Sequence, residues 1–186
     1  MTEPIEFETE RLVLRRWRES DLTPFAAMNG DHRVMEHFPK PLERLESDEL
    51  AHKIRAHIEE HGWGLWAVEV KAIAPFIGFV GLNVPNAALP FSPCVEIGWR
   101  LAFEHWRRGY ASEAARAVLG IAFETLDLAE LVSFTAVGNQ RSRRVMERIG
   151  MHFSCEFEHP ALPENCPLRA HVLYRLWRPT GARRPR

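Results

Sequence analysis

Cysteine is scarce in this sequence, with three residues among 186: Cys94, Cys155 and Cys166. They are widely separated, and no pair has the Cys-x-x-Cys spacing of zinc and dithiol sites. Three scattered cysteines do not provide the disulfide framework of a small secreted domain. We therefore expect no metal site built on cysteine, and a reducing compartment.

Long apolar runs and an excess of one charge are also lacking. Residues 1–6 have no apolar core of a signal peptide, and no apolar run approaches the length that spans a bilayer. These features predict a cytoplasmic protein with no membrane partner. The net charge of −1 at pH 7 argues against a dedicated nucleic-acid binder.

Apolar residues, in contrast, make up 46% of the 186 positions, which is enough for one complete hydrophobic core. We expect a single domain over residues 1–178. Residues 179–186 are rich in Pro, Arg and Gly and are expected to form a flexible basic tail.

Hydrophobic periodicity predicts alternating strands and helices along the chain. The expected helices are 22–28, 47–61, a helix that begins after Gly109, and one from Asn139 to Gly150; the expected strands are 12–17, 65–70, 76–83, 95–101, 131–137, 151–157 and 168–177. This order predicts an α/β (α+β) fold with a mixed, mostly antiparallel sheet flanked by helices.

A basic turn with a glycine leads directly into a helical sequence at residues 106–115, which read WRRGYASEAA. Main-chain N–H groups at a helix start have no intrahelical acceptor, and the helix dipole adds positive character there. Gly109 allows the chain to wrap closely around an anion, and Arg107 and Arg108 add charge. The turn therefore predicts a diphosphate site.

Two common phosphate motifs fit this turn poorly. No Lys-Ser or Lys-Thr pair follows the glycine, as a P-loop requires, and no Gly-x-Gly-x-x-Gly occurs, as in dinucleotide folds. A different nucleotide-bearing cofactor is indicated.

The turn resembles the acetyl-CoA signature of the GCN5-related N-acetyltransferases, Gln/Arg-x-x-Gly-x-Gly/Ala. Trp106 occupies the Gln/Arg position, which is similar to the RimJ/RimL-like branch that acetylates N-termini of ribosomal proteins. Three other segments resemble that branch in the same order, at 9–15, 96–101 and 139–151.

This resemblance implies acetyl-CoA as cofactor, with CoA as product and no metal. In the family, the strand before the phosphate turn pairs through its main chain with the pantetheine arm, and the helix-opening asparagine also hydrogen-bonds that arm. The implied cofactor-binding residues are Trp99, Arg100, Leu101, Arg107, Arg108, Gly109, Tyr110, Ala111, Ser112 and Asn139.

Glu96 is the candidate general base. In the strand 95–101 it lies on the face opposite the apolar residues, one residue from the main chain that would hold the thioester. An unperturbed glutamate, with a pKa near 4.3, is a weak base at neutral pH, so Glu96 would need burial or a water relay. The alternative is a structural ion pair with an arginine such as Arg100.

Met146 occupies the position of the tyrosine that protonates the leaving thiolate in most of the family. A thioether cannot give a proton, so the resemblance to the RimL-like branch implies Ser142 for this role. Local capping of the helix is the alternative for Ser142. Arg141, Arg143 and Arg144 either contact the ribose phosphate or form a solvated basic face.

The acceptor is expected to be a primary amine. An α-amine with a pKa near 8 is about 10% neutral at pH 7, whereas a lysine side chain is neutral only about 0.04% of the time. A protein N-terminus therefore suits a weak base, and a small-molecule amine is the alternative. The resemblance places the acceptor near His37, Phe38, Trp63, Phe91 and His159.

Two further readings stay open. One is a non-catalytic acetyl-CoA-binding protein, since the usual tyrosine is absent. The other is a zinc site, because residues 57–61 read His-x-x-Glu-His on a predicted helix. That helix ends at Gly62, and no later glutamate is clearly placed as a third ligand, so we expect no metal. Independently of both readings, dimerisation is common in the families that the sequence resembles, so a homodimer is among the expected partners, although no interface is indicated.

Overall fold

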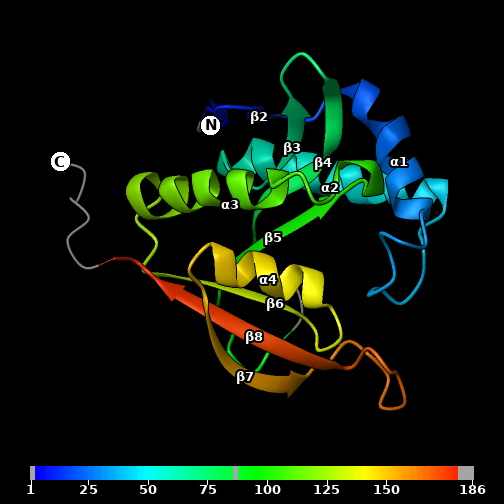
Figure 1. The fold of residues 1–186 in the computed structure, drawn as a ribbon, viewed down its shortest axis with the longest axis vertical. Helices are drawn as coiled ribbons and strands as arrows, with labels where there is room; N and C mark the ends of the chain where they lie inside the picture. The colour runs from blue at the N-terminus through cyan, green and yellow to red at the C-terminus, as the bar shows by residue number, and fades with distance from the viewer. Residues whose placement is uncertain (1–2, 86–87, 180–186) are drawn as a thin grey trace.

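The structure is a computed structural model that describes residues 3–85 and 88–179. Within those residues, eight strands form one sheet in the order β1-β2-β3-β4-β5-β6-β8-β7 (Figure 1). The strands are β1 Phe7–Glu8, β2 Leu12–Arg15, β3 Leu65–Val70, β4 Ala74–Asn83, β5 Glu96–Leu101, β6 Glu130–Ala136, β7 His152–Glu158 and β8 Ala170–Trp177. Every neighbouring pair is antiparallel except β5 and β6, which confirms the predicted mixed sheet.

In the described part of the chain, four α-helices cover the sheet: α1 Leu22–Gly30, α2 Arg44–His61, α3 Tyr110–Gly120 and α4 Gln140–Arg148. Helices α3 and α4 pack on one face, where Ala115 and Met146 join a core with Ile97. Helices α1 and α2 pack on the other face against an aromatic group that includes Trp17 and Phe79. None of the described helices is long and apolar enough to cross a membrane.

Most boundaries differ from the predicted ones by a few residues, and three differences have a clear structural reason. Helix α2 begins at Arg44, one turn before the predicted Ser47, because Glu43 and Glu46 form a reciprocal capping box. Strand β1 was not predicted, since it has only two residues. Helix α3 continues into a short π-helical turn, Ile121–Thr125, instead of ending as regular α-helix. The predicted basic tail lies outside the described residues from 180 onwards.

Candidate functional site

A gap opens between the two parallel strands at the centre of the sheet. Strand β4 pairs with β5 over six residues, but β5 pairs with β6 only at Glu96 and Val132. The Val132 N–H donates to the carbonyl of Val95 at 3.0 Å, and beyond this point the strands diverge (Figure 1). The sheet is therefore closed at Glu96 and open toward Leu101.

Alternate residues of β5 direct their main chain into this gap. The Val95 carbonyl points toward β6. Because the main-chain direction repeats every second residue of a strand, the N–H and C=O groups of Trp99 and Leu101 point to the same side. Arg100 has the opposite direction, like Ala102, whose N–H donates to the Ile77 carbonyl of β4 at 2.9 Å, so the main chain of Arg100 points away from the gap. Of the three residues expected to hold the pantetheine arm, Trp99 and Leu101 have the required main-chain direction and Arg100 does not.

The basic turn forms the far end of the gap. Gly109 caps α3 with φ of 82°, and Arg107 also has a positive φ, of 60°. The Glu113 N–H donates to the Gly109 carbonyl at 3.0 Å, whereas the six amides of residues 107–112 have no acceptor in the described part of the chain. These amides can therefore bind an anion at the start of α3.

A network that the sequence analysis did not identify holds this turn in place. Glu113 of α3 accepts hydrogen bonds from the Thr9 hydroxyl at 2.6 Å and from Arg11 Nε at 2.7 Å. Arg11 in turn donates to the Arg108 carbonyl at 3.1 Å and lies over the Tyr110 ring. The turn between β1 and β2 thus fixes the basic turn before α3 from about 100 residues away in sequence.

Glu96 sits where the two strands meet. Burial raises the pKa of its carboxyl to about 7, and the hydrogen bond from Asn83 Nδ2 at 3.4 Å opposes this only in part. Glu96 forms no ion pair with any described residue, and Arg100 instead donates to Asn29. The alternative of a Glu96–Arg100 ion pair is therefore wrong, and Glu96 can exchange a proton near neutral pH.

The start of α4 lies on the β6 side of the gap. Asn139 caps this helix by accepting the Ser142 N–H at 3.1 Å, and it donates to the Thr135 hydroxyl at 2.9 Å. The Ser142 hydroxyl has no hydrogen bond to a described residue, so capping does not occupy it. Met146 is 1% exposed and belongs to the core under α4.

The arginines of α4 have separate environments. Arg141 forms an ion pair with Glu36 and lies over the Trp106 ring, 4.8 Å from its centroid. Arg143 donates to the Tyr174 hydroxyl and to the Val137 carbonyl, so it serves the packing of α4. Arg144 is exposed.

The predicted acceptor residues fall into three places. His37 and Phe38 lie in the loop between α1 and α2, where Phe38 stacks on Arg100 at 4.2 Å. Phe91 and His159 join an aromatic cluster on the sheet face of Glu96, completed by Phe134, Phe157 and His171. Trp63 lies apart from both groups, beside the stacked rings of His57 and His61.

The His-x-x-Glu-His segment ends α2. Its two histidine rings stack with centroids 4.2 Å apart and pack against Trp63. Among the described residues there is no group of three or more His, Cys, Asp or Glu side chains arranged to hold a metal ion.

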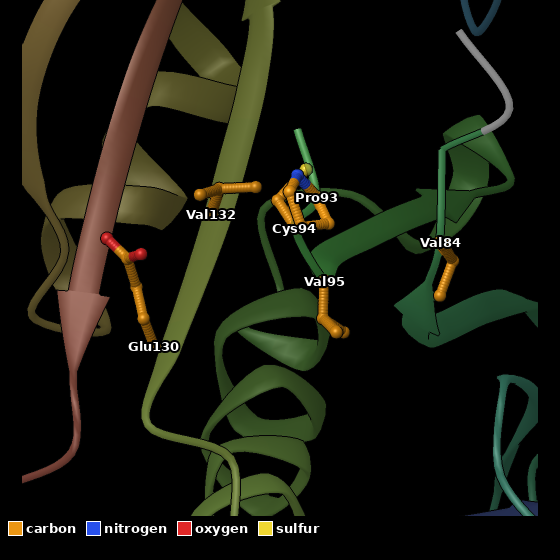
Figure 2. Close-up of a pocket in the computed structure, with 6 residues that line it drawn as sticks. All are labelled: Val84, Pro93, Cys94, Val95, Glu130 and Val132. Carbon is orange, nitrogen blue, oxygen red and sulfur yellow. The ribbon is translucent and has the colours of Figure 1, made fainter. Parts of the chain in front are cut away.

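A pocket of about 360 Å³ adjoins the closed end of the gap (Figure 2). Val132 points toward Pro93 and Cys94, and Val95 precedes Glu96 in the chain. Glu130 of this pocket is paired with Arg175 at 2.7 Å. The pocket shows that the sheet is accessible next to Glu96 from the loop between β4 and β5.

Comparisons with known proteins agree on one family. The profile of the acetyltransferase (GNAT) domain matches residues 11–152. The uncharacterized protein YkkB of Bacillus subtilis is 33% identical over 147 residues, which are 78% of this chain and 84% of that protein. An acetyltransferase from Agrobacterium tumefaciens has a TM-score of 0.75 and 30% identity, covering 95% of this chain and 96% of that chain.

Two structures with different acceptors share the fold at lower identity. Spermidine N-acetyltransferase of Vibrio cholerae, in complex with CoA and spermine, has a TM-score of 0.71 and 22% identity and covers 91% of this chain and 97% of that chain. Ribosomal-protein-S5-alanine acetyltransferase of Vibrio fischeri has a TM-score of 0.73 and 18% identity, with coverage of 96% and 99%.

Proposed function

The chain belongs to the GNAT acetyltransferase family, and from this premise we propose that it transfers the acetyl group of acetyl-CoA to a primary α-amine in a ternary complex. The proposal depends on one spatial arrangement. Glu96, with a pKa of about 7, lies at the closed end of the gap, and six amides without acceptors among the described residues lie beyond its open end.

The residues around the gap fit acetyl-CoA. The amides of residues 107–112 and the positive end of α3 suit its diphosphate, and the main chain of Trp99 and Leu101 suits the amides of its pantetheine arm. When bound, acetyl-CoA supplies an acetyl group activated as a thioester. Arg11 and Glu113 contribute by holding the turn in its binding conformation.

Glu96 removes the proton from the attacking amine, directly or through one water. A base with a pKa of about 7 is half deprotonated at neutral pH, and it matches the basicity of an α-amine better than an ordinary glutamate does. As the new N–C bond forms and the C–S bond breaks, the hydroxyl of Ser142 would give its proton to the departing thiolate and take one back from solvent water, while Glu96 returns the amine proton to solvent. That hydroxyl is not engaged by the described protein groups.

The acceptor has two candidate forms, a protein N-terminus and a small amine. The resemblance of the turn at Trp106 to the RimJ/RimL-like branch and the fold shared with the ribosomal-protein acetyltransferase support the first. The fold shared with the spermidine enzyme supports the second. The sheet face of Glu96 carries Phe91 and Phe134, and Arg100 follows on the same face of β5. A face with aromatic rings and a cation favours an α-amine without several positive charges over a polyamine.

Thiol release from acetyl-CoA, measured against peptides, amino acids and polyamines, tests the proposal. We expect turnover with at least one α-amine and none with acetyl-CoA alone beyond slow hydrolysis. Calorimetric binding of acetyl-CoA without turnover on any acceptor would reject the catalytic proposal. Absence of binding would also reject the assignment of the turn at Gly109.

A further inference from the structure

Arg100 occupies the same face of β5 as the proposed base. Glu96, Gly98 and Arg100 alternate with the apolar residues of the strand, and Gly98 lies between the two charged side chains. A methyl group built on Gly98 would have one described neighbour within 4 Å, the Glu96 Oε1 atom at 3.9 Å. The surface above Gly98 is therefore open to a small acceptor.

The guanidinium of Arg100 is held in a fixed position. Its Nη1 donates to Asn29 Oδ1 at 2.7 Å, and the fully buried Asn29 donates in turn to the Ser47 hydroxyl at 2.9 Å. Above and below, the guanidinium lies 4.2 Å from the ring centroid of Phe38 and 5.5 Å from that of Phe79. Such support from α1, α2 and β4 fixes the direction of the remaining donors.

The charge of Arg100 lacks a partner. No carboxylate of a described residue forms an ion pair with it, and its buried Nε has no hydrogen-bond acceptor among those residues. Burial lowers the pKa of Arg100 to about 10. Burying a cation without a counter-charge is unfavourable, so an anion that reaches this side chain would be bound strongly.

Arg15, which is 2% exposed, provides an internal comparison. It donates to both oxygens of Asp21, at 2.8 and 2.9 Å, and to Glu69 at 3.0 Å. Burial alone would lower the pKa of Arg15, but these carboxylates raise it above its ordinary value. This chain thus neutralises a buried arginine where the arginine only supports the fold.

We propose that Arg100 binds a carboxylate of the acceptor through its Nε–Nη2 edge, so that the acceptor is an α-amino acid whose amine lies over Gly98 beside Glu96. This inference rests on the proposed acetyl transfer. The Cα atoms of Glu96 and Arg100 are four residues apart in a strand, or about 13 Å. The Glu96 carboxylate extends into this span, with Oε1 3.9 Å from a methyl group built on Gly98, so that the distance left to the Arg100 guanidinium suits a molecule of amino-acid size.

Matched acceptors test the inference. L-phenylalanine, L-phenylalaninamide and 2-phenylethylamine share a ring that suits the cluster of Phe91 and Phe134, and they differ at the carboxylate. We expect wild-type kcat/KM to be at least about tenfold higher for the acid, because two charge-assisted hydrogen bonds from Arg100 to its carboxylate would give a difference of this size. Equal values for the three, or a preference for the amide or amine, would overturn the inference.

The substitution Arg100→Gln should reduce the ratio of acid to amide to near one, while the KM for acetyl-CoA stays within about twofold. Differences in amine basicity cancel, because both enzymes are compared on the same pair. The control is Arg55→Gln, which removes an arginine of α2 that is paired with Glu19. This variant should keep the wild-type ratio. A proportional loss on acid and amide in Arg100→Gln would indicate a structural role and overturn the inference.

A binding measurement separates this inference from the proposed function. Calorimetry with N-acetyl-L-phenylalanine and its amide, in the presence of CoA, requires no turnover. We expect wild-type protein to bind the acid at least about tenfold more tightly than the amide, and Arg100→Lys, which keeps the charge but not the fork, to retain only part of that difference. Selective binding with no turnover would reject only the catalytic proposal; no selectivity would reject the carboxylate site.

The carboxylate could also belong to the first side chain of a peptide. Peptides that begin with Asp or Glu, compared with the same peptides beginning with Asn or Gln, distinguish this source. A preference for the acidic peptides over free amino acids, abolished by Arg100→Gln, would keep the anion site but overturn the amino-acid acceptor.

Discussion

Glu96 shows how position alone changes the chemistry of a side chain. It is the first residue of β5, and within this strand it alone is paired on both sides, with Asn83 in β4 and Val132 in β6. Because the strands separate immediately after it, its carboxyl is enclosed by the sheet yet adjoins the opening. This placement brings the pKa of Glu96 to about 7 without a neighbouring carboxylate.

Replacing Glu96 by Gln should lower kcat by roughly 10²–10⁴-fold, because the amide keeps the shape of the side chain but cannot accept the proton. The KM for acetyl-CoA should change little. Steady-state kinetics with both substrates varied would measure this, with the exposed Glu124→Gln as control. Weakened cofactor binding with unchanged turnover would remove Glu96 as the base.

The same carboxyl should affect stability in the opposite direction from most acidic groups. The folded protein retains the Glu96 proton up to about pH 7, whereas an ordinary glutamate loses it near 4.5. Between these values the folded state binds more protons than the unfolded state, so this group makes stability fall as pH rises. Thermal unfolding from pH 4.5 to 7 should show a smaller decline in Glu96→Gln than in the wild type. Parallel Tm profiles would contradict the raised pKa.

At the scale of elements, the turn before α3 depends on one backbone conformation. Gly109 has φ of 82°, and a methyl group there would lie 3.3 Å from Arg11 Nη2. Gly150, after α4, has φ of 89° with no described neighbour within 4 Å of such a methyl group. The two glycines therefore carry the same backbone constraint and differ in what surrounds them.

Gly109→Ala and Gly150→Ala should each destabilise the protein by about 1–2 kcal/mol, the typical cost of a left-handed conformation for a residue with a side chain. Only Gly109→Ala should also weaken acetyl-CoA binding, since it disturbs the amides of the turn and the contact with Arg11. Chemical denaturation and calorimetry separate the two effects. Equal acetyl-CoA affinity in both variants would argue against the diphosphate site.

The elements and the turn could be predicted because their signals are local. The alternation of β5, the N-cap Asn139 and the glycine at the start of α3 are each read within a few residues. Three features were not predictable, because they arise only from three-dimensional packing: the Arg11–Glu113 network, the absence of an ion-pair partner for Arg100 among the described residues, and the packing of Trp63 against His57 instead of the other predicted acceptor residues. For Arg11 and Glu113 the only sequence signal was a pair of opposite charges 102 residues apart.

At the scale of the whole molecule, the sheet consists of two parts. Strands β1 to β5 form one antiparallel part, and β6, β8 and β7 form the other; one residue pair, Glu96 with Val132, joins them. A ligand lying in the gap would bridge the two parts where the sheet itself does not. Binding should therefore raise Tm, by an amount equivalent to about 2.7 kcal/mol at a hundredfold excess over Kd.

Hydrogen exchange can locate this bridge residue by residue. The alternation set by the Val95 carbonyl toward β6 and the Ala102 N–H toward β4 turns the Arg100 amide to β4 and the Trp99 amide to the gap. In the free protein the Arg100 amide should therefore exchange slowly and the Trp99 amide fast. Saturating acetyl-CoA should slow exchange at Trp99 and at the amides of residues 107–112, and leave Arg100 nearly unchanged. Protection that rises uniformly along β5, or only at the turn, would contradict a pantetheine arm paired to this strand, because the alternation is the signature of an added strand in the sheet.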